Sequence, residues 1–305
     1  MPRYAYCQGR FVPHRQAAVP IEDRGYTFAD GVYEVIPVSG GRLVDAGLHL
    51  DRLDYSLGEL RIPPPMSRRA LTLVADELMR RNALSDGFVY IQVTRGVAPR
   101  DHKFPKLAPK PVLTLTTRQL PPAPRRLDAG VGVITVPDQR WARCDIKSIS
   151  LLPNVLAKQA AAEAGCEEAW QVDAEGYVTE GAATNAWIVT DSKTVITRQA
   201  DHAILSGITR LSLQKVLAEA GYALEVRSFT VAEAKAAREA FLTSSTNYVR
   251  PITRIDGQPV GNGHPGLLTQ ALRDAYIDRV VTDGAGADAF TAQESWKTND
   301  GDARP

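Results

Sequence analysis

The chain has 305 residues, of which 44% are hydrophobic and 23% are charged, as is ordinary for a globular protein with a sizeable core. Its net charge of +1 gives no bias towards nucleic acid or an acidic membrane surface. The three cysteines are odd in number and lack metal-ligand spacing, so we expect reduced thiols, no metal site and a cytoplasmic protein. We also expect no signal peptide and no membrane span, because no run approaches roughly 20 apolar residues.

The first part of the chain alternates strand-like and helix-like patterns. Turn residues at Gln8-Gly9 and Gly40-Gly41 interrupt apolar runs, which predicts two hairpins. Ser67 precedes a run with helical periodicity and is the expected N-cap of that helix. The other predictions for this part are a helix over 48–60, the Ser67 helix over 67–84, and strands over 87–96 and 111–120.

A proline-rich segment, QLPPAPRR at 119–126, lacks periodicity and is the predicted linker between two domains. The predicted domains are a small N-terminal one over 1–118 and a larger C-terminal one over 127–280. Residues 281–305 are small, polar and aperiodic, so we expect a disordered tail.

The second part of the chain again mixes strands with helices. Gly165 and Gly221 each follow a run with helical periodicity, at the position where a left-handed cap ends a helix. The predicted elements are a strand over 130–138, helices over 151–165 and 206–221, and a strand meander over 167–198 with turns at Glu175-Gly176 and Asp191-Ser192.

Lys147 stands in an otherwise apolar run, RWARCDIKSISLL at 140–152. Period-2 alternation predicts a strand in which Lys147 and Ile149 share one face, so we expect Lys147 to point into a site. A low-dielectric site disfavours the charged form of a lysine and makes its amine nucleophilic. The alternative is an edge lysine whose amine reaches solvent.

Glu180 lies mid-strand between apolar residues in GYVTEGAATNAWIV, and small residues follow it. A buried glutamate is costly without a positive partner. Pyridoxal phosphate explains Glu180 and Lys147 together, since it offers an aldehyde to the lysine and a ring nitrogen that needs an acidic partner. A salt bridge between Lys147 and Glu180 is an alternative that the spacing leaves open.

Two segments are candidates for a phosphate site. Ile208 and Thr209 fall at a predicted helix N-terminus, where free N–H groups and the helix dipole favour an anion. A hydroxyl cluster, LTSSTNYVRP, places Ser245 at the end of a strand. Arg52 shares a helical face with His49 and is a candidate to reach the same anion. A simple helix cap and a solvated helix face are the alternatives.

A candidate carboxylate site lies in VTRGVAPRDHKFPK, where one residue separates Arg100 from His102. Their side chains can point the same way, and an arginine fork beside an imidazole suits a carboxylate. The hydroxyl of Tyr33 would add a further hydrogen bond. The alternatives are a solvated basic loop for the pair and a core aromatic for Tyr33.

Taken together, these residues resemble the fold-type IV pyridoxal-phosphate enzymes, and most closely the bacterial D-amino acid aminotransferases. The resemblance runs from about Tyr4 to about Ile277, and its most specific pieces are EDRGYTFADGVYE, QVTRGVAPRDHKFP, RWARCDIKSISLL and VTEGAATN. It implies an α/β (α+β) fold with a small N-terminal α/β domain. The larger C-terminal α/β domain would contain a strand-rich pseudo-barrel.

The resemblance also implies pyridoxal 5'-phosphate as the cofactor and a role for each candidate residue. Lys147 would be the catalytic residue that bonds the cofactor and moves the substrate proton, and Glu180 would pair with the ring nitrogen. The other implied roles are phosphate binding by Arg52, Ile208, Thr209 and Ser245, packing of Leu205 on the ring, and a carboxylate trap of Tyr33, Arg100 and His102, the last two from the other subunit of a homodimer.

The implied activity is transamination between a D-amino acid, such as D-alanine or D-glutamate, and a 2-oxo acid, 2-oxoglutarate or pyruvate. No nucleic-acid or membrane partner is expected. The alternatives are a branched-chain L-amino acid or (R)-amine transaminase, an aminodeoxychorismate-type lyase, and a non-catalytic carrier of pyridoxal phosphate. The chain departs from the family pattern at residues 181–184 and at Tyr248 and Arg250, which leaves the substrate range open.

Overall fold

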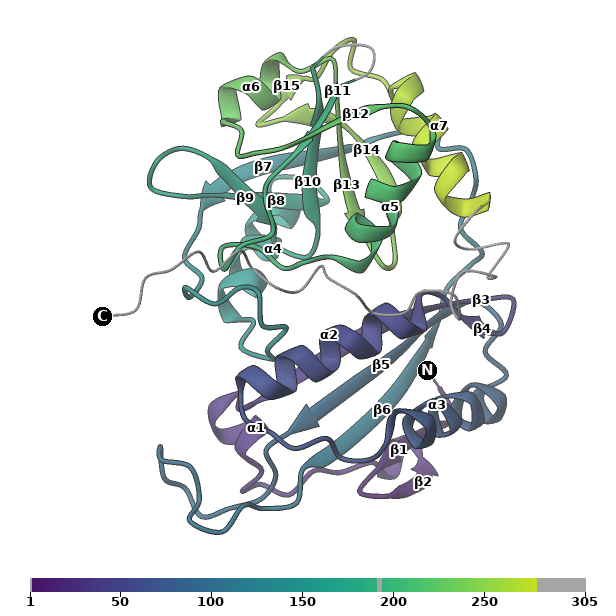
Figure 1. Ribbon diagram of the computed structural model, residues 1–305, viewed down its shortest axis with the longest axis vertical. Coiled ribbons are helices and arrows are strands. Elements are labelled where there is room, and N and C mark those ends of the chain that lie inside the picture. The colour runs from purple at the N-terminus through teal and green to yellow at the C-terminus, as the bar shows by residue number, and fades with distance from the viewer. Residues whose placement is uncertain (1, 191–193, 279–305) are drawn as a thin grey trace.

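The fold is known from a computed structural model, which describes residues 2–190 and 194–278. Two lobes are stacked along the long axis of the molecule (Figure 1). The N-terminal lobe comprises the elements up to Gln119, and the C-terminal lobe comprises those from Val131 onwards. Helix α2 lies along the boundary between the lobes.

The N-terminal lobe contains a six-stranded sheet in the order β2-β1-β6-β5-β3-β4. All of its pairings are antiparallel. Its elements are β1 (Tyr4–Cys7), β2 (Arg10–Pro13), η1 (His14–Gln16), α1 (Arg24–Phe28), β3 (Gly31–Ser39), β4 (Arg42–Leu43), α2 (Ala46–Glu59), α3 (Arg68–Asn82), β5 (Gly87–Thr94) and β6 (Val112–Gln119).

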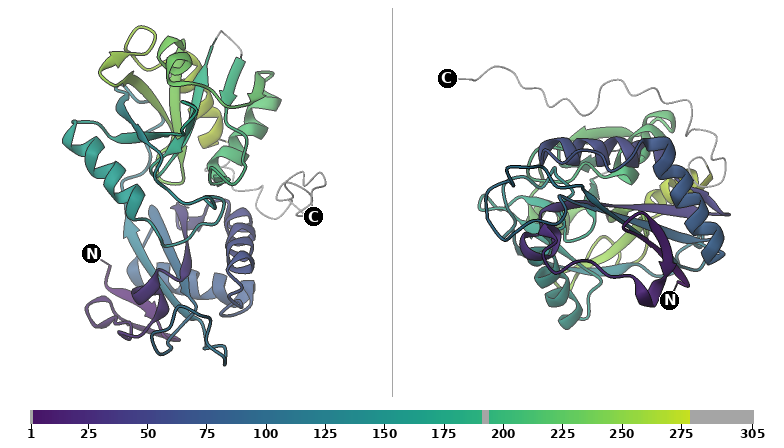
Figure 2. Two further views of the ribbon diagram at one scale, coloured as in Figure 1. Left: turned by 90° about the vertical axis from the view of Figure 1, so that its left-hand side faces the viewer. Right: turned by 90° about the horizontal axis from the view of Figure 1, so that it is seen from below.

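Helices α2 and α3 cover one face of this sheet (Figure 2). Val32 and Ile36 of β3 are buried in the same apolar cluster as Leu53 and Leu57 of α2. Because successive side chains of a strand point to opposite faces, Tyr33 of β3 lies on the face that the helices leave open. Tyr33 is accordingly only half-buried.

The C-terminal lobe contains a nine-stranded sheet whose main path is β12-β11-β10-β13-β14-β7-β8-β9, with β15 paired to β14. Strand β7 runs parallel to both of its neighbours, β8 and β14. The elements are β7 (Val131–Pro137), α4 (Leu152–Glu163), β8 (Glu168–Val172), β9 (Val178–Gly181), β10 (Asn185–Val189), β11 (Thr194–Thr197), α5 (Ile208–Glu219), β12 (Ala223–Val226), α6 (Val231–Ala236), β13 (Glu239–Ser244), β14 (Tyr248–Ile255), β15 (Gln258–Pro259) and α7 (Leu267–Tyr276).

Most of the predicted elements are confirmed. Gln8 and Gly9 both have positive φ angles in the first hairpin, as a tight turn requires. Ser67 accepts a hydrogen bond from the backbone N–H of Ala70 and caps α3. Gly165 and Gly221 follow α4 and α5 with positive φ angles. The mixed α/β fold is therefore as predicted.

Two predictions of secondary structure are wrong. Residues 141–151 do not form a strand, and their only regular feature is an isolated bridge between Ser148 and Val32. The run 167–198 is not a simple meander, because β9 does not pair with β10 and instead lies at the far end of the sheet path. The predicted turn at Asp191-Ser192 and tail at 281–305 lie outside the described residues.

The irregular segment 146–149 leaves the C-terminal lobe and docks on the N-terminal lobe. The backbone N–H of Tyr33 donates to the carbonyl of Lys147 at 3.0 Å, and that of Ile149 donates to Gly31 at 3.1 Å. The N–H of Lys147 donates to the hydroxyl of Ser56 in α2 at 3.1 Å. These bonds fix the backbone of Lys147 at the boundary between the lobes.

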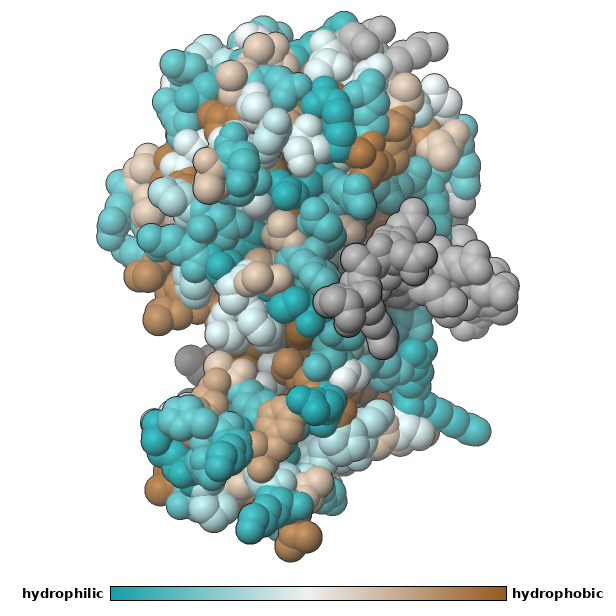
Figure 3. Space-filling view, turned by 60° about the vertical axis from the view of Figure 1, so that its left-hand side comes forward, coloured by the Kyte–Doolittle hydropathy of each residue, from teal (hydrophilic) through white to brown (hydrophobic). Residues whose placement is uncertain are grey.

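The surface narrows between the two lobes, and hydrophilic residues predominate on the face drawn in Figure 3. Among residues 2–190 and 194–278, no helix is long and apolar enough to cross a membrane.

Candidate active site

A pocket of about 690 Å³ lies between the lobes, and both lobes supply its walls. The N-terminal lobe contributes side chains from β3, α2, β5 and β6. The C-terminal lobe contributes β9, the start of α5 and the turn after β13, while the segment around Lys147 lies between them. The predicted site residues that line the pocket are Tyr33, Arg52, Lys147, Glu180, Leu205, Ile208, Thr209 and Ser245.

Lys147 is half-buried, and its side chain enters the pocket. Its Nζ lies 4.2 Å from the centroid of the Tyr33 ring. The Tyr33 ring in turn stacks on Tyr90 with 5.6 Å between the centroids. Lys147 forms no ion pair with the described part of the chain, so its amine remains available to a bound molecule.

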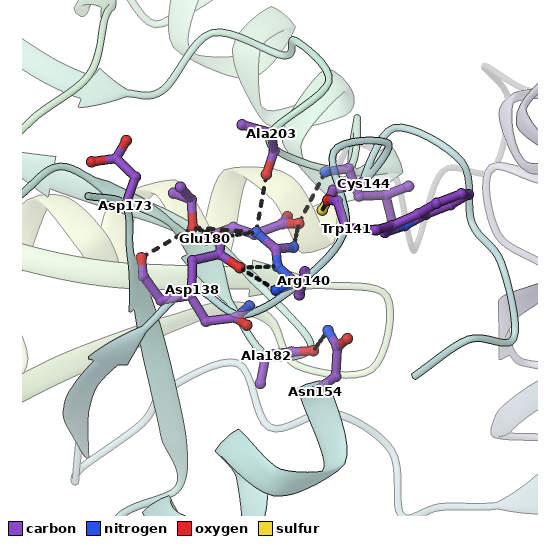
Figure 4. Close-up of polar contacts among 12 residues, drawn as sticks. Asp138, Arg140, Trp141, Cys144, Asn154, Asp173, Glu180, Ala182 and Ala203 are labelled. Atoms are coloured by element: carbon purple, nitrogen blue, oxygen red, sulfur yellow. Dashed lines mark hydrogen bonds and ion pairs between the residues drawn. The ribbon is translucent and has the colours of Figure 1, made fainter. Parts of the chain in front are cut away.

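Glu180 is buried on β9 and has a positive partner, but that partner is Arg140 and not Lys147. The alternative of a Lys147–Glu180 salt bridge is therefore wrong. The Glu180 carboxylate also accepts hydrogen bonds from the Leu205 N–H at 3.0 Å and the Asn185 amide at 2.9 Å. Figure 4 shows Glu180 and Arg140 side by side.

The electrostatics of Glu180 and Arg140 depend on further contacts. Burial raises the pKa of Glu180 above its ordinary value, and the nearby charge of Arg140 opposes this rise. Arg140 also forms an ion pair with Asp138 at 2.7 Å and donates to the Ala203 carbonyl at 3.0 Å (Figure 4). Because Asp138 shares the arginine, Glu180 keeps capacity for a second cationic partner in the pocket.

Arg52 belongs to a buried cluster behind the pocket. The fully buried Glu34 accepts from Arg52 Nε at 2.7 Å and Nη2 at 2.8 Å, and it contacts His49 Nδ1 at 2.7 Å. Burial would raise the pKa of Glu34, but Arg52 and His49 hold it well below its ordinary value. Arg52 Nη1 donates to the Ser206 carbonyl at 2.9 Å, which ties α2 to the approach to α5.

The N-terminus of α5 faces the same pocket and has no side-chain cap. Backbone N–H groups in the first turn of a helix have no partner within the helix, and they attract anions. Gly207 precedes the helix, and a Cβ there would lie 1.9 Å from Asn185 Oδ1, so the close approach requires glycine. Helix N–H groups, Arg52 and the Ser245 hydroxyl form a donor set that fits a phosphate.

Arg100 and His102 do not line the pocket of their own chain. Both side chains are exposed, and both lie against Phe28. The Arg100 guanidinium is 5.2 Å from the centroid of the Phe28 ring, and the His102 ring is 5.3 Å from it. The structure thus places this pair together, as their spacing predicts, but apart from the other site residues.

A comparison with protein-family models matches residues 31–255 to the class IV amino-transferases. The chain belongs to the class IV aminotransferase family. The resemblance of the sequence and the assignment of the protein as a pyridoxal-phosphate-dependent enzyme of fold type IV are thereby confirmed.

Curated relatives of this class IV aminotransferase include the D-alanine aminotransferase of Bacillus licheniformis. It is 39% identical over 277 residues, which cover 91% of this chain and 97% of that protein. The D-alanine aminotransferase of Listeria innocua is also 39% identical, over 89% of this chain and 94% of that protein.

Solved structures share the fold at lower identity. The branched-chain amino acid aminotransferase of Escherichia coli has a TM-score of 0.84 and 21% identity, over 92% of this chain and 95% of that chain. A hypothetical aminotransferase of Mycobacterium tuberculosis in its PLP-bound form has a TM-score of 0.78 and 22% identity, over 92% and 99%.

Several polar residues of this class IV aminotransferase escaped the sequence-based prediction. Glu34 interrupts the apolar run GVYEVIPV on its buried face, which was a signal of a paired carboxylate. Arg140 opens the same run that contains Lys147, but nothing in its spacing points to Glu180. Asn185 carried no signal, because its contact with Glu180 depends on the turn after β9.

We predict that Arg52→Met lowers the free energy of unfolding by about 3–5 kcal/mol, because it removes the main partner of a fully buried carboxylate. Replacing Glu34 by Met as well should restore part of this loss, since no unpaired charge remains. Denaturant unfolding of the cofactor-free variants near neutral pH measures both effects. A double variant less stable than Arg52→Met would contradict this account.

The ion pair of Arg52 with Glu34 also predicts how the free energy of unfolding depends on pH. The pKa of Glu34 is lowered in the folded protein, so the stabilising effect of Arg52 is present above the ordinary Glu34 value of 4.5 and declines as the pH falls below it. The stability difference between wild type and Arg52→Met should therefore narrow in acid. A difference that stays constant down to about pH 3 would exclude this linkage.

Proposed function

We propose that this aminotransferase exchanges the amino group of a D-amino acid, such as D-alanine or D-glutamate, with 2-oxoglutarate or pyruvate. The observation that carries the proposal is the common pocket of Lys147 and Glu180 beside an uncapped helix N-terminus. The similarity to D-alanine aminotransferases over most of the chain supports the D-amino acid substrate class.

When bound, pyridoxal phosphate supplies an aldehyde that bonds amines and a ring that accepts an electron pair. Lys147 would hold this group through its amine. Its Nζ is also the base that would take up the α-proton of the substrate and give it back. Lys147 would thus serve as both the covalent attachment and the proton carrier.

Arg140 and Asn185 hold the carboxylate of Glu180 in place, and this carboxylate would stabilise a proton on the ring nitrogen. Leu205, which lines the pocket, would pack against the ring. Binding of the phosphate falls to Arg52, the N–H groups of Ile208 and Thr209, and the hydroxyl of Ser245.

We infer that the protein works as a homodimer in which Arg100 and His102 enter the pocket of the second copy. Both are exposed and remote from their own pocket, so within one chain they have no catalytic use. The open face of the N-terminal sheet, which carries Tyr33, is only half-buried and is available for a second copy. Tyr33, Arg100 and His102 together would hold the substrate α-carboxylate.

We propose a small domain over 1–118 and a large domain over 127–280, joined by the linker 119–126. The enzyme is proposed to be cytoplasmic, with small-molecule substrates and neither nucleic acid nor a membrane as partner. Activity with D-alanine, tested beside L-leucine and an aromatic (R)-amine, separates this function from the transaminase alternatives.

Lys147→Ala should abolish the covalent bond to the cofactor that borohydride reduces. The measurement is mass spectrometry of peptides after reduction of the holoenzyme, with Lys158→Ala as a control, because Lys158 lies on α4 outside the pocket. A reducible adduct that persists in Lys147→Ala and disappears in the control variant would overturn the assignment.

Glu180→Gln should retain the cofactor but slow removal of the α-proton, since a neutral amide does not hold the ring nitrogen protonated. A charge-assisted hydrogen bond contributes about 1.5–3 kcal/mol, so we expect a rate loss of roughly tenfold to a hundredfold. Single-turnover kinetics with D-alanine measure this step. Wild-type rates in the variant would exclude Glu180 as the partner of the ring.

Arg100→Ala should lower kcat/KM for D-alanine by about 2 kcal/mol or more, while an amine without a carboxylate is much less affected. Mixing the Arg100→Ala and Lys147→Ala variants tests which subunit supplies Arg100 to the site. In a mixed dimer of Arg100→Ala and Lys147→Ala chains, one site contains both wild-type residues if Arg100 comes from the partner. Re-assembled mixtures should then recover about a quarter of wild-type activity. Without recovery, Arg100 acts within its own chain or only supports the structure.

A further inference from the structure

Arg118 is a basic side chain of the pocket to which the proposed function gives no role. It lies on β6, which pairs with β5 so that Arg118 is opposite Phe88, and Phe88 is opposite Pro37 of β3. The register is fixed at Gly87, where a Cβ would lie 2.0 Å from the carbonyl oxygen of Arg118. Arg118 and Phe88 both line the pocket.

The pairing orders these side chains along one face of the sheet. Tyr33 and Val35 of β3 share a face with Phe88 and Arg118, because alternate residues of paired strands point the same way. Along the strands, Val35 lies between the row of Tyr33 and the row of Arg118, and successive rows are about 7 Å apart. Across the sheet, β5 separates β3 from β6, which adds roughly 10 Å. The pocket floor therefore runs from Tyr33, past the apolar Val35, to Arg118.

The charges of the pocket leave Arg118 unpaired. Arg52 is neutralised by Glu34, and Arg140 is neutralised by Asp138 and Glu180. Lys147 has no carboxylate partner, but the reaction uses its amine. The Arg118 side chain forms no hydrogen bond or ion pair with any residue in 2–190 and 194–278. Its guanidinium is exposed at the wall of the pocket, so it meets an anion without losing an existing partner.

We propose that Arg118 binds the distal carboxylate of a dicarboxylic substrate of the glutamate and 2-oxoglutarate class. This inference rests on the proposed function, because it takes the α-carboxylate to lie at Tyr33. A substrate that runs diagonally from Tyr33 across Val35 and β5 brings its far end towards Arg118, whose long and exposed side chain can extend to meet it. An arginine fork matches a carboxylate with two parallel hydrogen bonds. Arg118 is thus a specificity-determining residue.

The kinetic test compares substrates that differ only in the distal carboxylate. Arg118→Met keeps an apolar stem and removes the charge, so we expect kcat/KM for D-glutamate to fall about tenfold, and that for D-alanine by less than about twofold. Arg118→Lys should recover part of the D-glutamate activity. Arg10→Met removes an exposed strand arginine outside the pocket and should leave the ratio of the two substrates unchanged. Equal losses on both substrates, or no loss, would overturn the proposal.

A binding measurement tests the role of Arg118 without relying on catalysis. Calorimetry of the holoenzyme with glutarate and with butyrate isolates the second carboxylate, since the two acids differ in that group. The wild type should bind glutarate more tightly, and Arg118→Met should lose that preference. A wild type without the preference, or a variant that retains it, would overturn the role of Arg118. A wild type that does not transaminate D-alanine would overturn the proposed function instead, and the calorimetry would still decide on Arg118.

Discussion

The site depends on the docking of residues 146–149 against β3. Two backbone hydrogen bonds, from Tyr33 to Lys147 and from Ile149 to Gly31, hold a segment of the C-terminal lobe on the N-terminal lobe. A third bond runs from the backbone N–H of Lys147 to the hydroxyl of Ser56. Gly31 eases this approach, because a Cβ there would lie 3.1 Å from Cδ1 of Ile149, and it would also lie 2.7 Å from the Val93 carbonyl of β5. Lys147 is therefore fixed by its own main chain, and its side chain extends into the pocket.

Two buried carboxylates, Glu34 and Glu180, fix the positions of other charged side chains around the pocket. Glu34 and Glu180 are both almost inaccessible to solvent, and each pairs with an arginine and at least one further donor. A buried ion pair gives little net stability, but removal of one member is costly, so each pair fixes the position of its partner. Arg52 is thereby aimed at the start of α5, and Glu180 is aimed into the pocket. Both arginines thus lie at the walls of the pocket, each paired with a buried carboxylate.

The sequence predicted most of the elements because they are locally encoded. The Ser67 cap, the turn at Gln8-Gly9 and the glycine after α4 each act within a few residues. The segment around Lys147 misled the same reasoning. Alternate residues of this segment are buried, as predicted. The cause is packing between the two lobes, and not hydrogen bonding to a neighbouring strand.

The site was predictable only where a residue carried its own signal. Lys147 and Glu180 were conspicuous as charges in apolar runs, and the family resemblance supplied the remaining roles. The ion pair of Arg140 with Glu180 joins positions 40 apart in the chain, and that pairing follows only from the curled sheet. The location of β9 at one end of the strand order was similarly beyond local patterns, since it depends on which strands meet.

Strand β3 presents different groups on its two faces. Glu34 points to the helix-covered face, where it fixes Arg52 beside the phosphate donors, and Tyr33 points to the open face, where it contacts Lys147. A slip of one residue in the register of β3 would exchange these faces and would place a carboxylate beside the lysine. The long ladder with β5, from Gly31 to Val38, opposes such a slip. The separation of the Glu34–Arg52 pair from the Tyr33–Lys147 contact is therefore a property of strand geometry, and the apolar residues of β3 enforce it by their burial under α2.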